Sequence, residues 1–401
     1  MMNGLLIPKG SPITIILNSL IFTYFFIYSI FRPYLIIKFA PIYLYIFFLL
    51  ILIILSSSEY FASFRMWTKY SISLMCLPVS FDIFKNKNSP NEIWGLFRCF
   101  IFLFLINYLI CNVFHLGGDG YTDDISGIEL GNLMDDSLHT NICVMAFVPL
   151  ALIIKAAKRK LFLILYVIFS IVLTIVILKR TPIVCIGIAI LTYFAGIIYL
   201  SNLFGKIDTS NLRLKIRTKF VAIISVIILG SLFSTVLYRN FEARSDRFNR
   251  GLAKEGRTRE LIAISEDVLL GNDKIKYLFG QETFNTVGTY AGGKFKKRMI
   301  HDNFGIIING AGIIGLLFYI FINMYLLFLL IRNLNKDKVC KNGIAYFYII
   351  IYISYWLMYQ MTSLSGTIWL MLYPSMTFSV MGMILRYFAD GAKMECISDD
   401  E

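Results

Sequence analysis

The stretch FGIIINGAGIIGLLFYIFINMYLLFLLI, residues 304–331, has no charged side chain over its whole length. About 20 apolar residues in a helix cross the ~30 Å hydrocarbon core of a bilayer, so this stretch predicts a membrane span. Hydrophobic residues make up 58% of the 401-residue chain, whereas soluble domains contain about 45–50%. Most of the chain is therefore predicted to cross a membrane, as one membrane domain over residues 1–401.

Apolar runs of similar length recur along the sequence. They predict about eleven transmembrane helices (ten to twelve) at 12–31, 39–57, 69–84, 94–114, 140–155, 161–178, 182–200, 219–238, 304–331, 344–360 and 366–387. The third run is the weakest, because it is short and contains Pro78 and Asp82. The first run follows Lys9 without a small-residue cleavage site, which favours an uncleaved first span. The predicted fold class is an all-α polytopic membrane protein.

The short loops predict the orientation. Lys and Arg gather in Ala156–Lys160, Ser201–Thr218 and Arg332–Lys341, and such an excess is typical of cytoplasmic loops. The segment His115–His139 has acidic residues and no Lys or Arg, which suits the outer side. The C-terminus is then inside and the N-terminus outside. An even number of spans, through a missed or re-entrant segment near 34–57, remains open.

One long charged insertion, Arg239–His301, interrupts the hydrophobic pattern. The flanking spans place this loop, residues 239–302, outside the cytoplasm, and its cations outnumber its acids. An outward cationic loop suggests an anionic substrate. The chain's net charge of +13 does not predict a nucleic-acid partner, because most Lys and Arg collect in cytoplasmic loops. The loop is predicted to be partly helical.

The seven cysteines are scattered, with no CxxC pair and no histidine at ligand spacing. They predict small apolar core residues and neither a disulfide framework nor a metal site. None lies in the loop, which therefore has no covalent staple of its own.

The tetrapeptide Lys179-Arg180-Thr181-Pro182 separates two predicted spans and must lie at the outer membrane boundary. Thr181 suits an N-cap and Pro182 the first helical position. A helix N-terminus beside Arg180 predicts an anion site, since its free N–H groups and dipole favour negative charge. The alternative is that the Lys179 and Arg180 side chains only snorkel to the membrane–water interface and bind no substrate.

Within the loop, Gly256 to Leu270 predicts an amphipathic helix, followed by a turn. Arg257 and Arg259 lie two residues apart and cannot share one helical face, so at most one of them points at a common target. His301 ends the loop, and Asp302 or Asn303 can cap the helix that follows. A histidine at the mouth of a membrane cavity can act as a general base, and it can equally be a solvated loop residue.

Together these segments resemble the O-antigen polymerase and O-antigen ligase superfamily of bacterial envelope assembly, over roughly residues 115–330. The match follows chain order: Asn141 after a polar outer loop, Lys179-Arg180-Thr181 at an (S/T)RG-like hinge, Gly256-Arg257 at a GRxxxW-like segment, Phe279-Gly280…Phe284 at an (F)GxGxxxF-like turn, and His301-Asp302-Asn303-Phe304…Gly312…Gly315 at an HNxxLxxxxxxGxxG-like helix start.

This resemblance implies a GT-C-like, metal-independent, inverting glycosyltransferase of the inner membrane that needs no nucleotide sugar or other cofactor. It implies that Arg180 and Arg257 hold the diphosphate of an undecaprenyl-diphosphate-linked oligosaccharide, and that His301 activates the acceptor hydroxyl on the periplasmic face. Arg259, Lys179 and Asn303 are further substrate-binding candidates. The sequence departs from the family pattern where Thr181-Pro182, Leu261 and Asp302 replace other residues. Arg259 is therefore the alternative candidate to Arg257 for binding the diphosphate.

The expected function is an O-antigen polymerase that joins lipid-linked repeat units. The alternatives are a ligase that transfers the glycan to lipid A core and, less favoured, a flippase for lipid-linked oligosaccharide. A chain-length regulator and a flippase are the expected protein partners, besides the bilayer itself.

Overall fold

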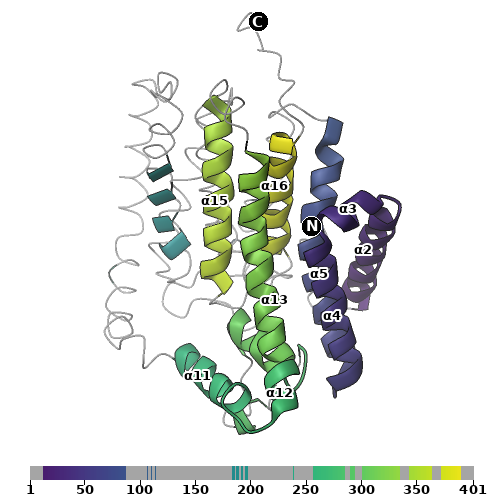
Figure 1. Ribbon diagram of the computed structural model, residues 1–401, viewed down its shortest axis with the longest axis vertical. Coiled ribbons are helices and arrows are strands. Elements are labelled where there is room, and N and C mark those ends of the chain that lie inside the picture. The colour runs from purple at the N-terminus through teal and green to yellow at the C-terminus, as the bar shows by residue number, and fades with distance from the viewer. Residues whose placement is uncertain are drawn as a thin grey trace, which may run out of the picture.

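A computed structural model gives the structure of the protein (Figure 1). It describes residues 12–86, 256–284, 290–293, 300–334, 343–363 and 372–389, with single positions between 106 and 113, between 183 and 196, and at 238. All regular elements in these segments are helices and none is a strand. The all-α expectation is confirmed for this part of the chain. The predicted spans between residues 94 and 238 lie almost wholly outside the described residues.

The N-terminal helices are α2 (Pro12–Ile30), the short α3 (Pro33–Lys38), α4 (Ala40–Ser56) and α5 (Tyr60–Ile83). The predicted runs 12–31 and 39–57 correspond to α2 and α4, with α3 as a six-residue elbow between them. The third run, predicted as 69–84, is part of a longer helix. Helix α5 begins nine residues earlier and continues through Pro78 to Ile83.

The C-terminal part has three long helices that lie side by side (Figure 1). They are α13 (Asn303–Asn333), α15 (Gly343–Ser363) and α16 (Leu372–Ala389). Among the described helices, α13 alone is long and apolar enough to cross a membrane. The shorter helices Ile15–Ile30 and Ala40–Ser56 are also apolar.

Helix α16 packs along α5, and small residues make this close contact. A Cβ atom at Gly382 would lie 2.3 Å from the carbonyl oxygen of Leu77, so only glycine fits there. The hydroxyls of Ser73 and Ser375 lie 3.1 Å apart across the same interface. Close backbone approach through small residues is how helices associate where the solvent is as apolar as the side chains.

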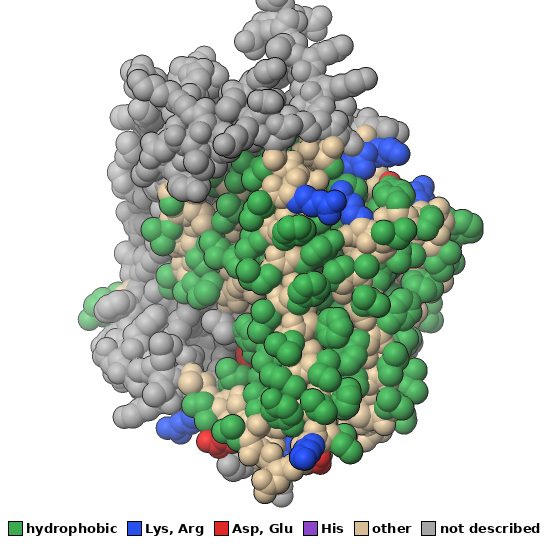
Figure 2. Space-filling view, viewed as in Figure 1, with side chains coloured by type: hydrophobic (Ala, Val, Ile, Leu, Met, Phe, Trp, Pro, Cys, Tyr) green, Lys and Arg blue, Asp and Glu red, His purple; other side chains and the backbone are tan. Residues whose placement is uncertain are grey.

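The outer surface of α2, α4 and α13 is apolar (Figure 2). Exposed large side chains on these helices are Ile16, Leu20, Ile27, Leu44, Ile51, Ile54, Leu55, Leu317, Phe321, Met324 and Phe328. Figure 2 shows Lys and Arg at the upper edge of this face and a mixture of acidic and basic groups at the lower edge. A soluble monomer rarely exposes such a large apolar face.

Candidate functional site

The helical part of the loop is fastened to the lower end of α13 (Figure 1). It consists of α11 (Gly256–Val268) and α12 (Lys274–Phe279), which confirms the predicted amphipathic helix and the turn after it. Asp267 on α11 accepts hydrogen bonds from Lys276 Nζ at 2.7 Å and Gln281 Nε2 at 2.8 Å. One carboxylate thus ties α11 to α12 and to the segment that follows, without a disulfide.

Helix α13 is broken at Gly312, whose φ of 61° and ψ of −155° are not helical. At such a break the carbonyls one turn earlier lose their usual donors. The loop supplies replacements: the Gln281 N–H donates to the Asn309 carbonyl at 2.6 Å, and Thr283 Oγ1 donates to the Gly310 carbonyl at 2.6 Å. Buried backbone groups are therefore satisfied at the break, as an apolar environment requires.

The turn at Gly280 makes this attachment possible. Gly280 has φ 77°, and a Cβ there would lie 2.5 Å from the Ala311 nitrogen and 2.6 Å from the Asn309 oxygen. At Gly312, a Cβ would lie 2.6 Å from the Leu278 carbonyl. The glycines of α13 allow a neighbouring element to approach its backbone closely. The neighbour in the structure is α12 with the turn after it.

The break divides α13 into two pieces with different roles. From Ile313 to Asn333 the helix is about 30 Å long at 1.5 Å per residue, which is enough to cross a bilayer core. From Asn303 to Ala311 the helix is short, and its last carbonyls accept hydrogen bonds from the loop. The N-terminus of this short piece is where the predicted base, His301, lies.

Glu260, on α11, is the centre of the site. Its side chain has no exposed surface, and both of its oxygens have partners. Tyr290 donates its hydroxyl to Oε1 at 2.6 Å. The backbone N–H of His301 donates to Oε2 at 3.1 Å, and His301 Nδ1 lies 3.5 Å from the same oxygen. The side chain of His301 is 41% exposed, so a buried carboxylate holds the inner edge of a half-exposed imidazole.

The surroundings of Glu260 favour its ionised form. Burial raises the pKa, but the hydrogen bonds from the His301 side chain, from Tyr290 and from the His301 backbone outweigh burial, and the pKa falls below its ordinary 4.5. A buried charge that accepts several hydrogen bonds is stabilised in its ionised form. Glu260 therefore presents a fixed negative charge to the imidazole.

Asp302 is the N-cap of α13, which resolves the choice between Asp302 and Asn303. Its Oδ1 accepts from the Gly305 N–H at 2.5 Å. Asn303 is fully buried, and its Nδ2 donates to Ser363 on α15 at 3.0 Å. Tyr319 shares the same Ser363 hydroxyl at 2.9 Å. The residues after His301 thus lock the start of α13 to its neighbour, so that the position of His301 is fixed from both sides.

The predicted cations are placed unequally. Lys179 and Arg180 lie outside the described residues. Arg257 lies in the first turn of α11, and the structure does not describe its side chain. Arg259 is exposed on α11, next in sequence to Glu260. The structure therefore brings the helix that carries Arg257 and Arg259 against His301.

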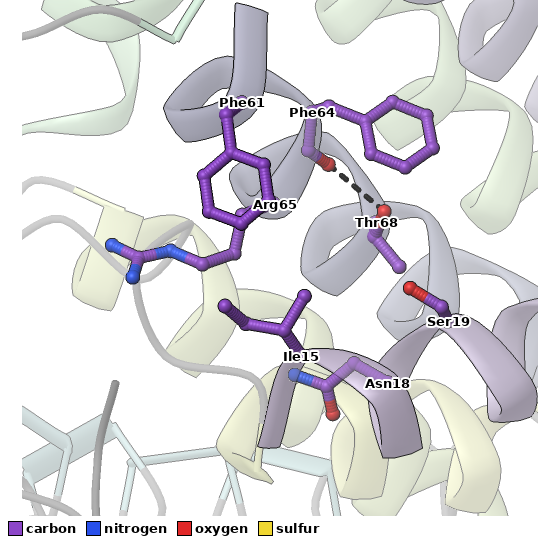
Figure 3. Close-up of a pocket in the computed structure, with 7 residues that line it drawn as sticks. All are labelled: Ile15, Asn18, Ser19, Phe61, Phe64, Arg65 and Thr68. Atoms are coloured by element: carbon purple, nitrogen blue, oxygen red, sulfur yellow. Dashed lines mark hydrogen bonds between the residues drawn. The ribbon is translucent and has the colours of Figure 1, made fainter. Parts of the chain in front are cut away.

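A separate cavity of about 20 Å³ lies between α2 and α5 (Figure 3). Its polar lining includes Asn18, Ser19, Arg65 and Thr68, and the Thr68 hydroxyl donates to the Phe64 carbonyl at 2.8 Å. Figure 3 shows the Arg65 guanidinium pointing away from Ser19 and Thr68. The cavity is smaller than the ~300–1,000 Å³ of typical ligand sites. It does not include His301 or Glu260, and we do not assign it to catalysis.

Glu260 and Tyr290 were not predicted as site residues, because no local sequence pattern marks them as a pair. In the described segments no three His, Cys, Asp or Glu side chains lie together as a metal site would require. Glu260, held by Tyr290, can orient the imidazole of His301. The imidazole can then accept a proton.

Comparison with protein families and with curated proteins gives no match to this chain.

Proposed function

We propose that the protein is an O-antigen polymerase of the bacterial inner membrane. It transfers a repeat-unit glycan from undecaprenyl diphosphate to a sugar hydroxyl of another lipid-linked unit at the periplasmic face. The observation that carries this proposal is the contact of the half-exposed His301 with the buried Glu260, at the end of one long apolar helix. The sequence motifs resemble those of the O-antigen superfamily in their order along the chain, and this resemblance supplies the substrate class.

In the proposed reaction the acceptor hydroxyl loses its proton to the imidazole as its oxygen bonds the anomeric carbon. The anomeric carbon–oxygen bond to the diphosphate breaks, and the electron pair leaves with undecaprenyl diphosphate. Attack opposite the leaving group inverts the anomeric centre. When Nδ1–H faces a carboxylate, Nε2 is the basic nitrogen. Glu260 would hold the ring in this tautomer and stabilise the imidazolium that forms.

The diphosphate needs cations more than it needs an acid, because it is already a good leaving group. We propose that Arg180 and Arg257 hold it, with Arg259 as the alternative on the same helix. Arginine grips phosphate oxygens through two parallel N–H bonds. Charge stabilisation of this kind is usually the largest single contribution to catalysis. Helix α11 would then bring a cation and the carboxylate behind the base into one place.

The test is glycan transfer by the purified protein with a lipid-linked repeat unit as substrate. His301→Ala and Arg180→Ala should each lower the rate by about 10²-fold or more, since general bases contribute typically 10²–10⁴-fold. His139→Ala, in the acidic outer loop, is the matched control and should keep the rate. Wild-type turnover in both His301→Ala and Arg180→Ala would contradict the proposed site.

A deletion strain separates polymerase from ligase. Lipopolysaccharide with a core and a single repeat unit indicates loss of the polymerase. Core alone, with long glycan left on its undecaprenyl carrier, indicates loss of the ligase instead.

A further inference from the structure

Helix α12 and the turn before it present apolar side chains on the outside of the loop. Leu270 is 78% exposed and Ile275 is 73% exposed, and Leu278 and Phe279 are exposed as well. Ile275, Leu278 and Phe279 are spaced i, i+3 and i+4, so they share one face of α12. Residues 270–279 therefore form an exposed segment with an apolar face, although the loop as a whole is rich in charge.

Backbone and charged groups of this segment are satisfied within the loop. The N–H groups of Ile275 and Lys276 donate to Asp273 Oδ1 at 2.9 Å and 3.2 Å. Lys276 Nζ donates to Asp267 Oδ1 at 2.7 Å. The Gly280 N–H donates to the Lys276 carbonyl at 2.8 Å. These groups need no water as a partner, which suits a segment that enters an apolar environment.

The break in α13 fixes the level of α12 along that helix. A Cβ atom at Gly312 would lie 2.6 Å from the Leu278 carbonyl, so α12 lies directly on α13 at this residue. Arg332, in the last turn of α13, marks one end of the apolar stretch. A bilayer core of ~30 Å takes about 20 helical residues, and counted back from Arg332 they reach Gly312. Helix α12 therefore lies at the opposite boundary of the core.

The exposure of α13 changes at the same level. All residues from 305 to 312 are buried. After the break, Leu317, Ile320 and Phe321 are exposed. The apolar outer surface of α13 thus begins within about two turns of the residue on which α12 lies. Figure 2 shows this apolar face reaching down to a lower edge where acidic and basic groups begin.

We propose that residues 270–279 lie in the membrane interface at the loop end of α13, with Leu270 and Ile275 at the border between lipid headgroups and acyl chains. Apolar faces of surface helices are buried about 5–10 Å into this border. Tyr277, also exposed, suits this level, because amphipathic rings gather at membrane interfaces. The partner is the phospholipid surface, and the proposal does not depend on the transfer reaction. Through Asp267, the bilayer would also hold α11 at a fixed depth.

The experiment is photocrosslinking of the full-length protein in liposomes of phosphatidylethanolamine and phosphatidylglycerol. The photoreactive residue p-benzoylphenylalanine replaces Leu270 or Ile275 in separate variants. On irradiation it bonds to a neighbouring C–H group, and a bonded phospholipid adds its mass to the protein in mass spectrometry. The yield of lipid adduct at both positions should be about tenfold or more above the yield at Glu266, an exposed acidic position on α11.

Two further measurements make the result specific. The same probe at Leu317, on the exposed surface of α13, is the positive reference and should form lipid adducts in every folded preparation. Ile275→Asp should lower the adduct yield at Leu270 severalfold, because a charge is costly at this depth, whereas Ile275→Leu should leave the yield unchanged. If the probe at Ile275 prevents folding, the probe at Leu270 carries the test.

Two outcomes would overturn the proposal. One is a lipid yield at Leu270 and Ile275 no higher than at Glu266, in preparations whose Leu317 probe forms lipid adducts. The other is a protein–protein adduct in place of the lipid adduct, which would assign the apolar face of α12 to a second copy of the chain.

Discussion

Substitution of Glu260 by Gln tests the link between the loop and the proposed base. Glu260 accepts from Tyr290 on one oxygen and faces the backbone N–H and Nδ1 of His301 with the other. An amide keeps one acceptor and replaces the other by a donor. One of these partners would then face a donor in a buried site, which costs about 1–3 kcal/mol.

The expected loss of activity follows from this geometry. Residues that orient a reacting group by hydrogen bonding to it typically contribute about 10–100-fold to activity. We expect Glu260→Gln to slow transfer by about 10–100-fold, less than the loss from His301→Ala. Because Glu260 would act through the imidazole, the double variant should be no slower than His301→Ala alone.

The assay is the single-turnover rate of glycan transfer, with thermal unfolding measured on the same preparations. Glu266→Gln makes the same change on the exposed side of α11 and should leave the rate unaltered. Tyr290→Phe removes one hydrogen bond from the same carboxylate but keeps both His301 contacts, and should cost less than Glu260→Gln. Wild-type turnover by folded Glu260→Gln, or full additivity with His301→Ala, would refute the reasoning.

Three further predictions concern how the loop is attached. Gly280→Ala should destabilise the protein by about 3 kcal/mol or more, because the glycine-only conformation costs about 1–3 kcal/mol and the new Cβ meets backbone of α13; an unchanged melting temperature would contradict this. Asp302→Ala should cost about 1 kcal/mol through loss of the N-cap, whereas Asp302→Asn should recover most of it; equal melting temperatures for the two variants would argue against the cap. Glu260 has a pKa below its ordinary 4.5 in the folded protein; its contribution to stability is therefore present above that value and lost as the pH falls through the folded-state pKa. The protection of α11 against hydrogen exchange, relative to an unstructured peptide at the same pH, should fall below about pH 4.5 in the wild-type protein, and this fall should be absent in Glu260→Gln.

Much of the described fold follows from the sequence alone. The apolar run 304–331 predicts α13, and the runs 12–31 and 39–57 predict α2 and α4, because hydrophobicity is a property of neighbouring residues. The start of α5 was not predicted. Arg65 and Lys69 make the first turns of this helix less hydrophobic than a membrane span usually is.

The candidate site was predictable only in part. His301 and the arginines of α11 come from the order of the polar segments. Glu260 was unremarkable in sequence, because 41 residues separate it from His301. The break at Gly312 was also missed, since a glycine in an apolar run equally suits close helix packing. The φ and ψ of Gly312, together with the donors of Gln281 and Thr283, show that α13 is broken there.

Local composition is enough to predict most of the described helices and the end of α13 that carries the loop, because both depend on residues that are neighbours in sequence. The folded structure is needed to show that a buried carboxylate lies behind His301 and that Gly280 lies on the backbone of α13. The reason is physical: hydrogen-bond partners distant in sequence are chosen by the path of the folded chain, and no local pattern encodes that path.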